Sequence, residues 1–268
     1  MSSGADRKTR RARLTLAGLG VLAAAVLVGG GYAAAVLLND GGGSGTPAAG
    51  AAASGAPGKA PSGAPSMSAP GKQGPKTPET GFKMVLDKPK DHANGVATGF
   101  APSPTGAISA AVYWWEEYAW LDDQKARQQL EAVVSPDSKG YIDQQVSEVR
   151  KLREGIGLPP SGGTPSGITF TTSVIAERTY SLPVEGEKPG AVVEVWLTYD
   201  RYATGPNGQP DEKPLKNQLT NVILRWQNGM WRITNQPDYV KHSNYPMTYS
   251  PGSATAWLDG WRQVQHAG

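Results

Sequence analysis

Residues 224–233 read LRWQNGMWRI, and this stretch decides the fold because it predicts a β-hairpin. At its centre, Asn228-Gly229 favours the positive φ angles of a type I′ turn. Both arms of the hairpin, and two segments before it, alternate between apolar and polar residues as half-buried strands do. The sequence therefore predicts four consecutive antiparallel strands. They cover residues 168–182, 193–199, 219–226 and 230–234.

Upstream of these strands the apolar residues recur with the spacing of a helix. From Ile108 they fall at i, i+3, i+4 and i+7, a stripe that includes Trp115. Ser103-Pro104 precedes the stripe as a start signal. Two further helices should follow, capped by Asp122 or Asp123 and by Asp137 or Ser138. A short last helix, capped by Ser253, should carry Ala254, Trp257, Leu258, Trp261 and Val264 on its apolar face.

Three helices followed by antiparallel strands predict an α+β fold. A curved, cone-like sheet would wrap the first helix and bury Trp115 and Tyr118. On an ideal helix, Trp114 and Trp120 lie to the flanks of the apolar stripe. They either widen the buried face or form an exposed aromatic patch, and aromatic residues are enriched at interfaces. Trp114 and Trp120 are therefore the candidate residues for contact with a partner.

The aromatic residues divide the chain into two parts. All 8 Trp and all 3 Phe lie from Gly81 onward, so residues 81–268 should form one domain. Residues 39–80 are almost entirely Gly, Ala, Pro, Ser and Thr. Such a segment buries too little apolar surface to offset chain entropy. We expect it to be a disordered linker with a reach of roughly 35 Å.

The N-terminus has the pattern of a membrane anchor. Residues 14–38 carry no charge, and about 25 residues at about 1.5 Å each cross a hydrocarbon core of about 30 Å. The basic residues in 1–13 predict a cytoplasmic N-terminus and an extracellular domain at residues 81–268. A cleaved signal peptide is the alternative, with Ala33-Ala34-Ala35 as the processing site, although the apolar run is long for one.

Composition and charge exclude several classes of function. Of 26 Lys plus Arg, five lie in 1–13 and three in the linker, and only three of 23 Asp plus Glu lie outside the domain. The domain is therefore slightly acidic, which argues against nucleic-acid binding. The chain has no Cys and 3 His, at positions 92, 242 and 266. We assign no catalytic, cofactor-binding or metal-ligating residue.

The order of elements over 105–234, with the closing hairpin at 224–233, resembles the nuclear transport factor 2-like (cystatin-like) superfamily. A basic tail, one span and an external domain of this class are similar to assembly factors of type IV secretion systems and to conjugation proteins of Gram-positive plasmids. Residues 97–111, ATGFAPSPTGAISAA, resemble openings of membrane proteins from actinobacterial mobile elements.

This resemblance implies a non-catalytic, membrane-anchored scaffold of an envelope complex. Its expected partners are other envelope or secretion-complex proteins, further copies of the chain and the membrane at 14–38. A second hypothesis is a module that holds a lipid or another apolar ligand in the cone. A third is a hydrolase or isomerase with an Asp or His base facing the cone. A filled cone favours the first, an open apolar cavity the second.

Overall fold

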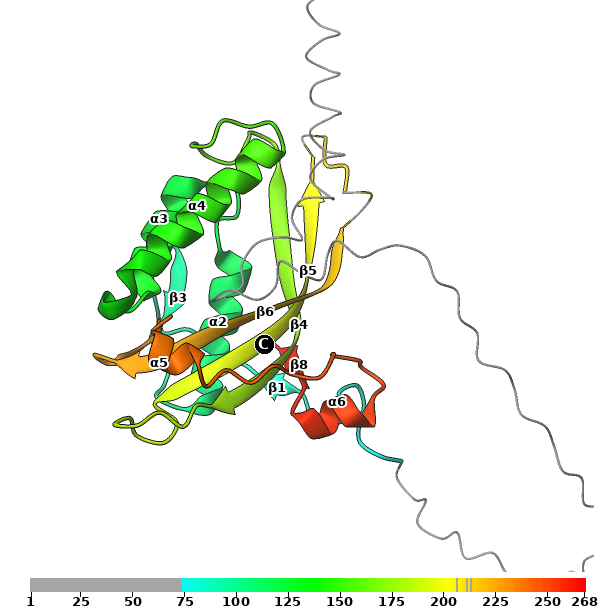
Figure 1. The fold of residues 1–268 in the computed structure, drawn as a ribbon. Helices are drawn as coiled ribbons and strands as arrows, with labels where there is room; N and C mark the ends of the chain where they lie inside the picture. The colour runs from blue at the N-terminus through cyan, green and yellow to red at the C-terminus, as the bar shows by residue number, and fades with distance from the viewer. Residues whose placement is uncertain (1–73, 206, 211, 213) are drawn as a thin grey trace, which may run out of the picture.

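The computed structural model describes residues 74–205, 207–210, 212 and 214–268 (Figure 1). The basic tail (1–13), the expected membrane span (14–38) and most of the expected linker (39–80) lie outside these residues. Within the described ranges, no helix is both long and apolar enough to cross a membrane.

A strongly curled sheet forms the body of the domain, and helices pack on it. Its six strands lie in the order β1-β8-β4-β5-β6-β7, and every neighbouring pair is antiparallel except β1 with β8. A separate hairpin pairs β2 with β3. The strands are β1 Met84–Val85, β2 Asp91–Ala93, β3 Val96–Thr98, β4 Thr169–Ser181, β5 Val192–Thr204, β6 Leu215–Gln227, β7 Met230–Ile233 and β8 Arg262–Gln265.

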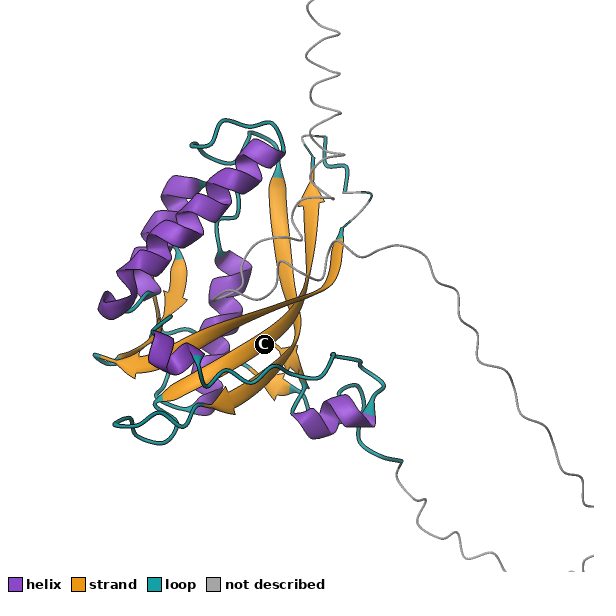
Figure 2. Cartoon of the chain, viewed as in Figure 1, coloured by secondary structure: helices purple, strands orange, loops and turns teal. Residues whose placement is uncertain are grey.

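The helices precede and follow the long strands. Figure 2 shows the strands curling past α2, with α3 and α4 side by side and α6 apart from them. The α+β class expected from the sequence is therefore confirmed. The helices are α2 Pro104–Glu117, α3 Asp123–Val133, α4 Lys139–Gly155, α5 Pro237–Val240 and α6 Ala254–Asp259.

The closing hairpin forms as predicted. Asn228 and Gly229 have φ angles of 52° and 79°, the left-handed values that a type I′ turn requires. Trp226 pairs with Trp231 across the strands, and their rings meet edge to face with centroids 5.4 Å apart. The same signal occurs at Asn94-Gly95, with φ angles of 51° and 76°, where it joins β2 to β3.

The starts of α2 and α3 follow the predicted signals, whereas Ser138 precedes α4 without a side-chain capping hydrogen bond. The Ser103 hydroxyl accepts a hydrogen bond from the Gly106 amide at 3.0 Å, and Pro104 opens α2. Asp122 Oδ1 accepts from the Lys125 amide at 2.9 Å, so Asp122 is the cap of α3. These side chains satisfy amides that have no partner within their helices.

The C-terminal helix is shorter than predicted. It begins after Ser253, whose hydroxyl accepts from the Ala256 amide at 3.2 Å, but it ends at Asp259. Gly260 follows with a φ of 108°, a left-handed value that stops the helix. Trp261 therefore follows the helix. Val264 lies in β8, which residues 262–265 form between β1 and β4.

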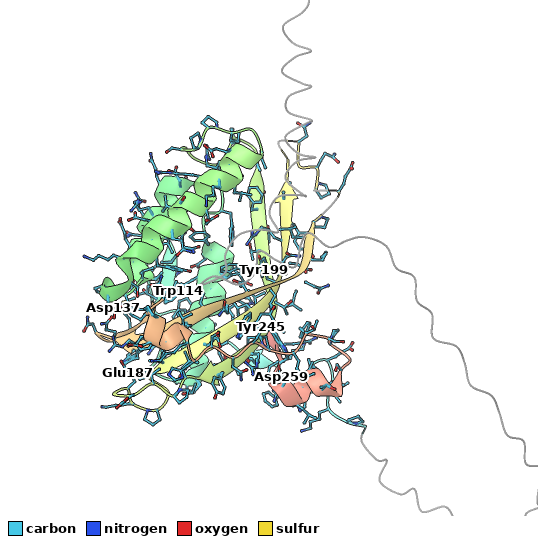
Figure 3. All side chains as sticks on the ribbon, in the orientation of Figure 1. Trp114, Asp137, Glu187, Tyr199, Tyr245 and Asp259 are labelled. Carbon is cyan, nitrogen blue, oxygen red and sulfur yellow. The ribbon has the colours of Figure 1, made fainter. Side chains whose placement is uncertain are left out.

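The two faces of the sheet are covered by different parts of the chain. Inward-facing Val195, Leu197 and Tyr199 pack against α2, while Trp196 faces the other way onto Trp261 of the C-terminal segment. Figure 3 labels Tyr199 and, on the outer face, Tyr245, whose ring meets Trp196 edge to face at 4.8 Å. Because successive side chains of β5 point to opposite faces, this strand contributes to an apolar layer on each side of the sheet.

The last residues of the expected linker already contact the domain. The Glu79 amide donates to the Pro251 carbonyl at 2.9 Å, and the Gly81 amide closes a turn on the Thr77 carbonyl at 2.8 Å. Gly81 also lies directly against the Trp257 ring, where an added Cβ would be 2.1 Å from the indole. Ordered contacts therefore begin at Thr77, slightly before the boundary expected from composition.

Candidate functional site

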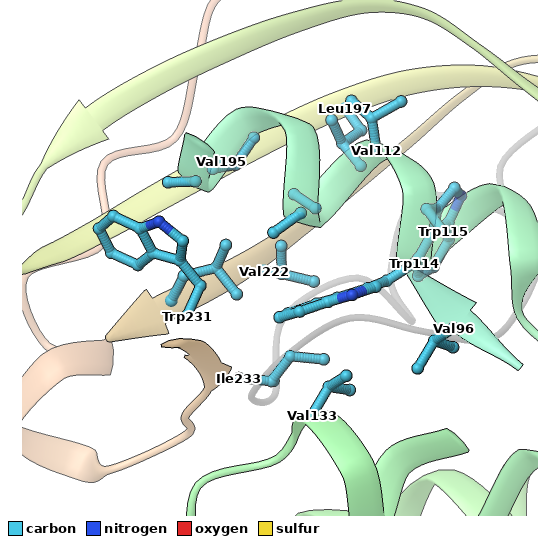
Figure 4. Packing of buried hydrophobic residues seen from close by; sticks show 14 of the residues in the cluster. Val96, Val112, Trp114, Trp115, Val133, Val195, Leu197, Val222, Trp231 and Ile233 are labelled. Carbon is cyan, nitrogen blue, oxygen red and sulfur yellow. The ribbon is translucent and has the colours of Figure 1, made fainter. Parts of the chain in front are cut away.

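The concave side of the sheet is filled by side chains. Figure 4 shows the Trp114 indole from α2 among Val133, Val222 and Ile233 of the surrounding elements. The space left between α2, α3, α4 and the sheet is a cavity of about 30 Å³. Pockets that hold drug-sized ligands measure about 300–1,000 Å³. The interior is therefore a packed core rather than a preformed pocket for a lipid.

The polar groups on the wall of this cavity are neutral. They are the side chains of Gln129 and Gln145 and those of two tyrosines, Tyr118 and Tyr141. Gln129 is used structurally, since its Oε1 accepts from the Ala119 amide at 2.8 Å and its Nε2 donates to the Glu117 carbonyl at 2.9 Å. Burial raises the pKa of both tyrosines, which holds them in the protonated form.

Trp114 and Trp120, the candidate partner-contact residues, are both buried. Each has 6% exposure, as has Trp115. Trp114 Nε1 donates to the Ala97 carbonyl at 2.6 Å, which fixes α2 to β3. Trp114 therefore belongs to the buried face of α2, whereas Trp120 follows the end of the helix and is covered by the Arg201 guanidinium. A role for the two indoles in binding a partner stays a prediction.

Trp120 belongs to an aromatic cluster at the end of α2. Its ring centroid lies 4.8 Å from that of Trp115 and 4.9 Å from that of Tyr118, both at steep angles. Trp115 in turn meets Tyr199 of β5 at 5.2 Å. These edge-to-face contacts connect the loop after α2 to the inner face of the sheet.

A buried arginine completes this cluster. Arg201 of β5 is 3% exposed, and its guanidinium carbon lies 3.3 Å from the ring centre of Trp120 and 5.0 Å from that of Tyr199. Its Nε donates to the Thr172 hydroxyl at 3.0 Å. Burial lowers the pKa of Arg201 to about 10, against the opposing effect of Tyr199, so the group stays a cation at neutral pH.

Arg201 is not among the residues predicted from the sequence. A signal was available, because Arg201 continues the alternation of Val193, Val195, Leu197 and Tyr199 and therefore occupies an inward-facing position. A charged residue at such a position is unusual, since arginine is seldom buried without a partner.

Two adjacent glutamates at the end of α2, Glu116 and Glu117, bind neighbouring strands. Glu116 Oε1 accepts from the Val174 amide at 2.9 Å, and Glu117 Oε2 accepts from the Ala97 amide at 2.7 Å. These carboxylates therefore attach α2 to β4 and β3. Burial raises the pKa of Glu117, and the hydrogen bond from Ala97 offsets part of that increase.

Asp123 is 1% exposed and holds a loop. It accepts from the Gly162 amide at 2.8 Å and the Ser161 hydroxyl at 3.0 Å, and it pairs with Arg150 at 2.8 Å. Burial alone would raise the pKa of Asp123, but these hydrogen bonds together hold it below its ordinary value.

The histidines do not gather at one place. His92 is exposed in β2, His242 follows α5, and His266 Nε2 lies 2.8 Å from Glu116 Oε2 near the C-terminus. In the part of the chain that the structure describes, no group of three or more His, Asp or Glu side chains is placed to hold a metal ion.

Comparisons of the chain with protein-family models, with curated proteins and with solved structures gave no match. The resemblance to the nuclear transport factor 2-like superfamily therefore stays a prediction.

Proposed function

We propose that the chain is a non-catalytic scaffold that is anchored in the membrane by residues 14–38 and assembles an envelope complex for conjugative transfer or secretion. The observation that carries the proposal is the filled concave side of the sheet. A fold of this kind that bound a ligand or substrate in its interior would need an opening there, whereas Trp114, Trp115 and their neighbours leave about 30 Å³. Its outer surfaces are then the parts available to other proteins.

Localisation is part of this proposal and rests on the sequence pattern. The basic residues before the apolar run favour a cytoplasmic N-terminus, with residues 39–268 outside the cell. Protease added to intact cells should remove the domain and leave a small membrane-bound fragment. A domain that is protected until the cells are lysed would contradict this topology.

A complementation experiment tests the scaffold role. The gene is deleted from a donor cell, and the frequency of transfer of its mobile element is measured. The full chain should restore transfer, whereas residues 1–80 alone or an exported domain without the anchor should not, because a scaffold must both bind partners and stay at the membrane. Normal transfer after the deletion would overturn the proposal.

Solvent extraction of bound molecules distinguishes the scaffold from the alternative, a module that binds a lipid. The full chain is purified in detergent, and bound apolar molecules are extracted with solvent and quantified by mass spectrometry. The packed interior leads us to expect far less than one molecule per chain. One molecule per chain, lost in a Trp115→Ala variant that still folds, would favour a ligand-binding module.

A further inference from the structure

Exposed apolar side chains gather near the point where the described chain begins. Among the described residues, seven large hydrophobic side chains are exposed, and three of these are tyrosines, whose hydroxyls can meet water. The other four have no hydroxyl. Three of the four lie on α6 or beside it, and the fourth lies in β1. Single exposed apolar residues are common, but a group of them marks a contact surface. The four are Phe82, Val85, Met247 and Leu258.

Three of these residues and one further indole surround α6. The Phe82 ring meets the half-buried ring of Trp257 edge to face, with centroids 5.1 Å apart. Leu258 follows Trp257 in the helix and is 83% exposed. The Met247 amide donates to Asp259 Oδ2 at 2.9 Å, which holds the Met247 segment against the end of the helix. We call Phe82, Met247, Trp257 and Leu258 the α6 patch.

A cation adjoins the aromatic part of the α6 patch. The guanidinium carbon of Arg262 lies 3.5 Å from the ring centre of Trp257 and 5.1 Å from that of Phe82. Lys83 and Glu79 are exposed nearby, so the net charge is small and apolar side chains carry any contact made here. Aromatic and aliphatic side chains beside basic ones are typical of protein surfaces that lie at the boundary between lipid headgroups and acyl chains.

The chain enters the domain at the α6 patch. The described residues begin at 74, and the Glu79 amide donates to the Pro251 carbonyl at 2.9 Å, just before α6. Gly81 then lies directly against the Trp257 ring. Figure 1 shows the start of the described chain beside α6. An attachment through the N-terminal part of the chain therefore acts on this end of the domain.

The length of chain before residue 74 keeps the α6 patch close to a membrane. If residues 14–38 span the bilayer as proposed, residues 39–73 join the span to the domain. A flexible segment of that length has a typical reach of roughly 30–35 Å. A domain of about 195 residues has a radius of gyration of roughly 16 Å and is roughly 40 Å across. The α6 patch is therefore the part of the surface held nearest to the lipid.

The small size of the α6 patch favours a membrane over a folded protein as its partner. A stable protein interface buries roughly 800 Å² on each side and uses roughly 20–30 residues. A few side chains bind too weakly for that, but they suffice when a linker holds the domain at an effective concentration on the order of millimolar. A bilayer also needs no complementary shape, because apolar side chains enter it one by one.

We propose that the α6 patch rests on the outer surface of the phospholipid bilayer, with Phe82, Trp257 and Leu258 between the headgroups and the upper part of the acyl chains. This inference rests on the membrane anchor in the proposed function. It adds an orientation, because contact at α6 holds the domain against the bilayer instead of at the full reach of the linker.

Quenching of tryptophan fluorescence by brominated lipid tests this contact. Residues 1–80 contain no Trp, so the expected span gives no signal, and six of the eight indoles are buried. The full chain is reconstituted in phosphatidylcholine vesicles with or without bromine on the upper acyl chains. We expect bromine to lower the emission of the wild type and to have no effect on Trp257→Phe. Equal quenching of the two proteins would overturn the proposal.

Flotation of the same vesicles separates this inference from the anchor on which it rests. A chain that floats with the vesicles but is not quenched keeps the anchor and lacks contact at α6, which overturns the inference alone. A chain that does not float contradicts the anchor itself, and the contact at α6 is then wrong as well.

A charge placed in the α6 patch tests the contact independently of Trp257. Leu258→Glu should keep the fold, since Leu258 is 83% exposed, and should lower the quenching about threefold or more, because a carboxylate does not enter lipid. Gln128→Glu is the matched control, since Gln128 is exposed on α3, apart from α6 (Figure 2). Its quenching should equal that of the wild type. Equal quenching of the two variants would contradict the contact.

A second copy of the chain is the other possible occupant of an apolar patch, and an introduced thiol detects it. The chain has no Cys, so Leu258→Cys carries a single thiol. If the α6 patch faces lipid, oxidation of this variant in vesicles should leave it monomeric. Efficient formation of disulfide-linked dimers, together with unquenched emission of the wild type, would assign the patch to an interface between two copies and overturn the proposal.

Discussion

At the scale of single residues, Trp114 and Trp115 are adjacent in the chain and equally buried, at 6% exposure each. Replacing either one by Ala should lower the free energy of unfolding by about 3–5 kcal/mol, through lost transfer energy and the cavity left behind. The apolar stripe that begins at Ile108 would by itself predict a large loss of unfolding free energy only for Trp115→Ala. Because Trp114 also donates to the Ala97 carbonyl, its loss should be at least as large.

Denaturant unfolding of the two variants measures these losses. Leu258→Ala is the control, since Leu258 is 83% exposed and should change stability by less than about 0.5 kcal/mol. A small loss for Trp114→Ala with a large one for Trp115→Ala would mean that only one flank of α2 is covered.

A buried carboxyl gives a pH dependence whose sign can be worked out. Glu177 of β4 is 2% exposed, and burial raises its pKa to about 7, although Thr179 and Arg262 act in the opposite direction. The folded state therefore favours the protonated acid. Its stabilising contribution is full below about pH 4.5, the ordinary value, and is lost as the pH rises through about 7.

Unfolding of wild type and Glu177→Gln between pH 4 and pH 8 isolates this contribution. The wild type should lose on the order of 3 kcal/mol relative to the variant over that interval, because one pKa unit corresponds to about 1.4 kcal/mol. Parallel curves for the two proteins would show that Glu177 is not protonated preferentially in the folded state.

At the scale of elements, replacing two glycines by Ala tests the turn and helix assignments. One replacement should lower the stability of the domain and the other should raise it. Gly229 has a φ of 79°, and an Ala there meets no atom within 4 Å, so its cost is conformational alone. Gly229→Ala should destabilise the domain by roughly 1–2 kcal/mol. Gly140, in the first turn of α4, is equally open but has no positive φ. Gly140→Ala should stabilise by about 0.5–1 kcal/mol.

The same denaturation measurements decide between these outcomes. Two losses of similar size would indicate that residue 140 is not helical, and two gains that residue 229 is not in a left-handed turn.

The long elements were predictable because each contains several turns or alternations and a cap or turn residue at its end. Short strands were not, since β1, β8 and the β2–β3 hairpin offer two to four residues each, too few for a period to show. The C-terminal helix was extended too far because Trp261 and Val264 fit its spacing, while Gly260 acts as a stop that spacing alone does not reveal.

The candidate site is a product of tertiary structure. Trp120 comes from the loop after α2 and Arg201 from the far part of β5, and only the curl of the sheet brings them together. The alternation along β5 predicts that Arg201 faces inward, but it does not predict which aromatic ring covers the guanidinium. For the same reason the burial of Trp114 depends on β3, which the sequence pattern did not reveal.

At the scale of the whole molecule, the domain should fold without the anchor and the linker, because its apolar core is built from residues beyond 83. The turn at 77–80 nevertheless adds to it, through the Glu79–Pro251 hydrogen bond and the buried Pro78. A fragment of residues 74–268 should therefore be more stable than one of 81–268 by about 1 kcal/mol. For a domain of this size that corresponds to roughly 2–4 °C in melting temperature.

Thermal unfolding of the two fragments, followed by near-ultraviolet circular dichroism, measures this difference, and both transitions should be cooperative. A third fragment, 77–268, is the control. Residues 74–76 are exposed, so the 77–268 and 74–268 fragments should melt at the same temperature. If the 77–268 fragment instead melts at the same temperature as the 81–268 fragment, the turn contributes nothing to stability and the domain begins at Gly81. If all three bind a hydrophobic dye and lack a cooperative transition, then the core needs residues 1–73, and the division of the chain into a tether and an independent domain is wrong.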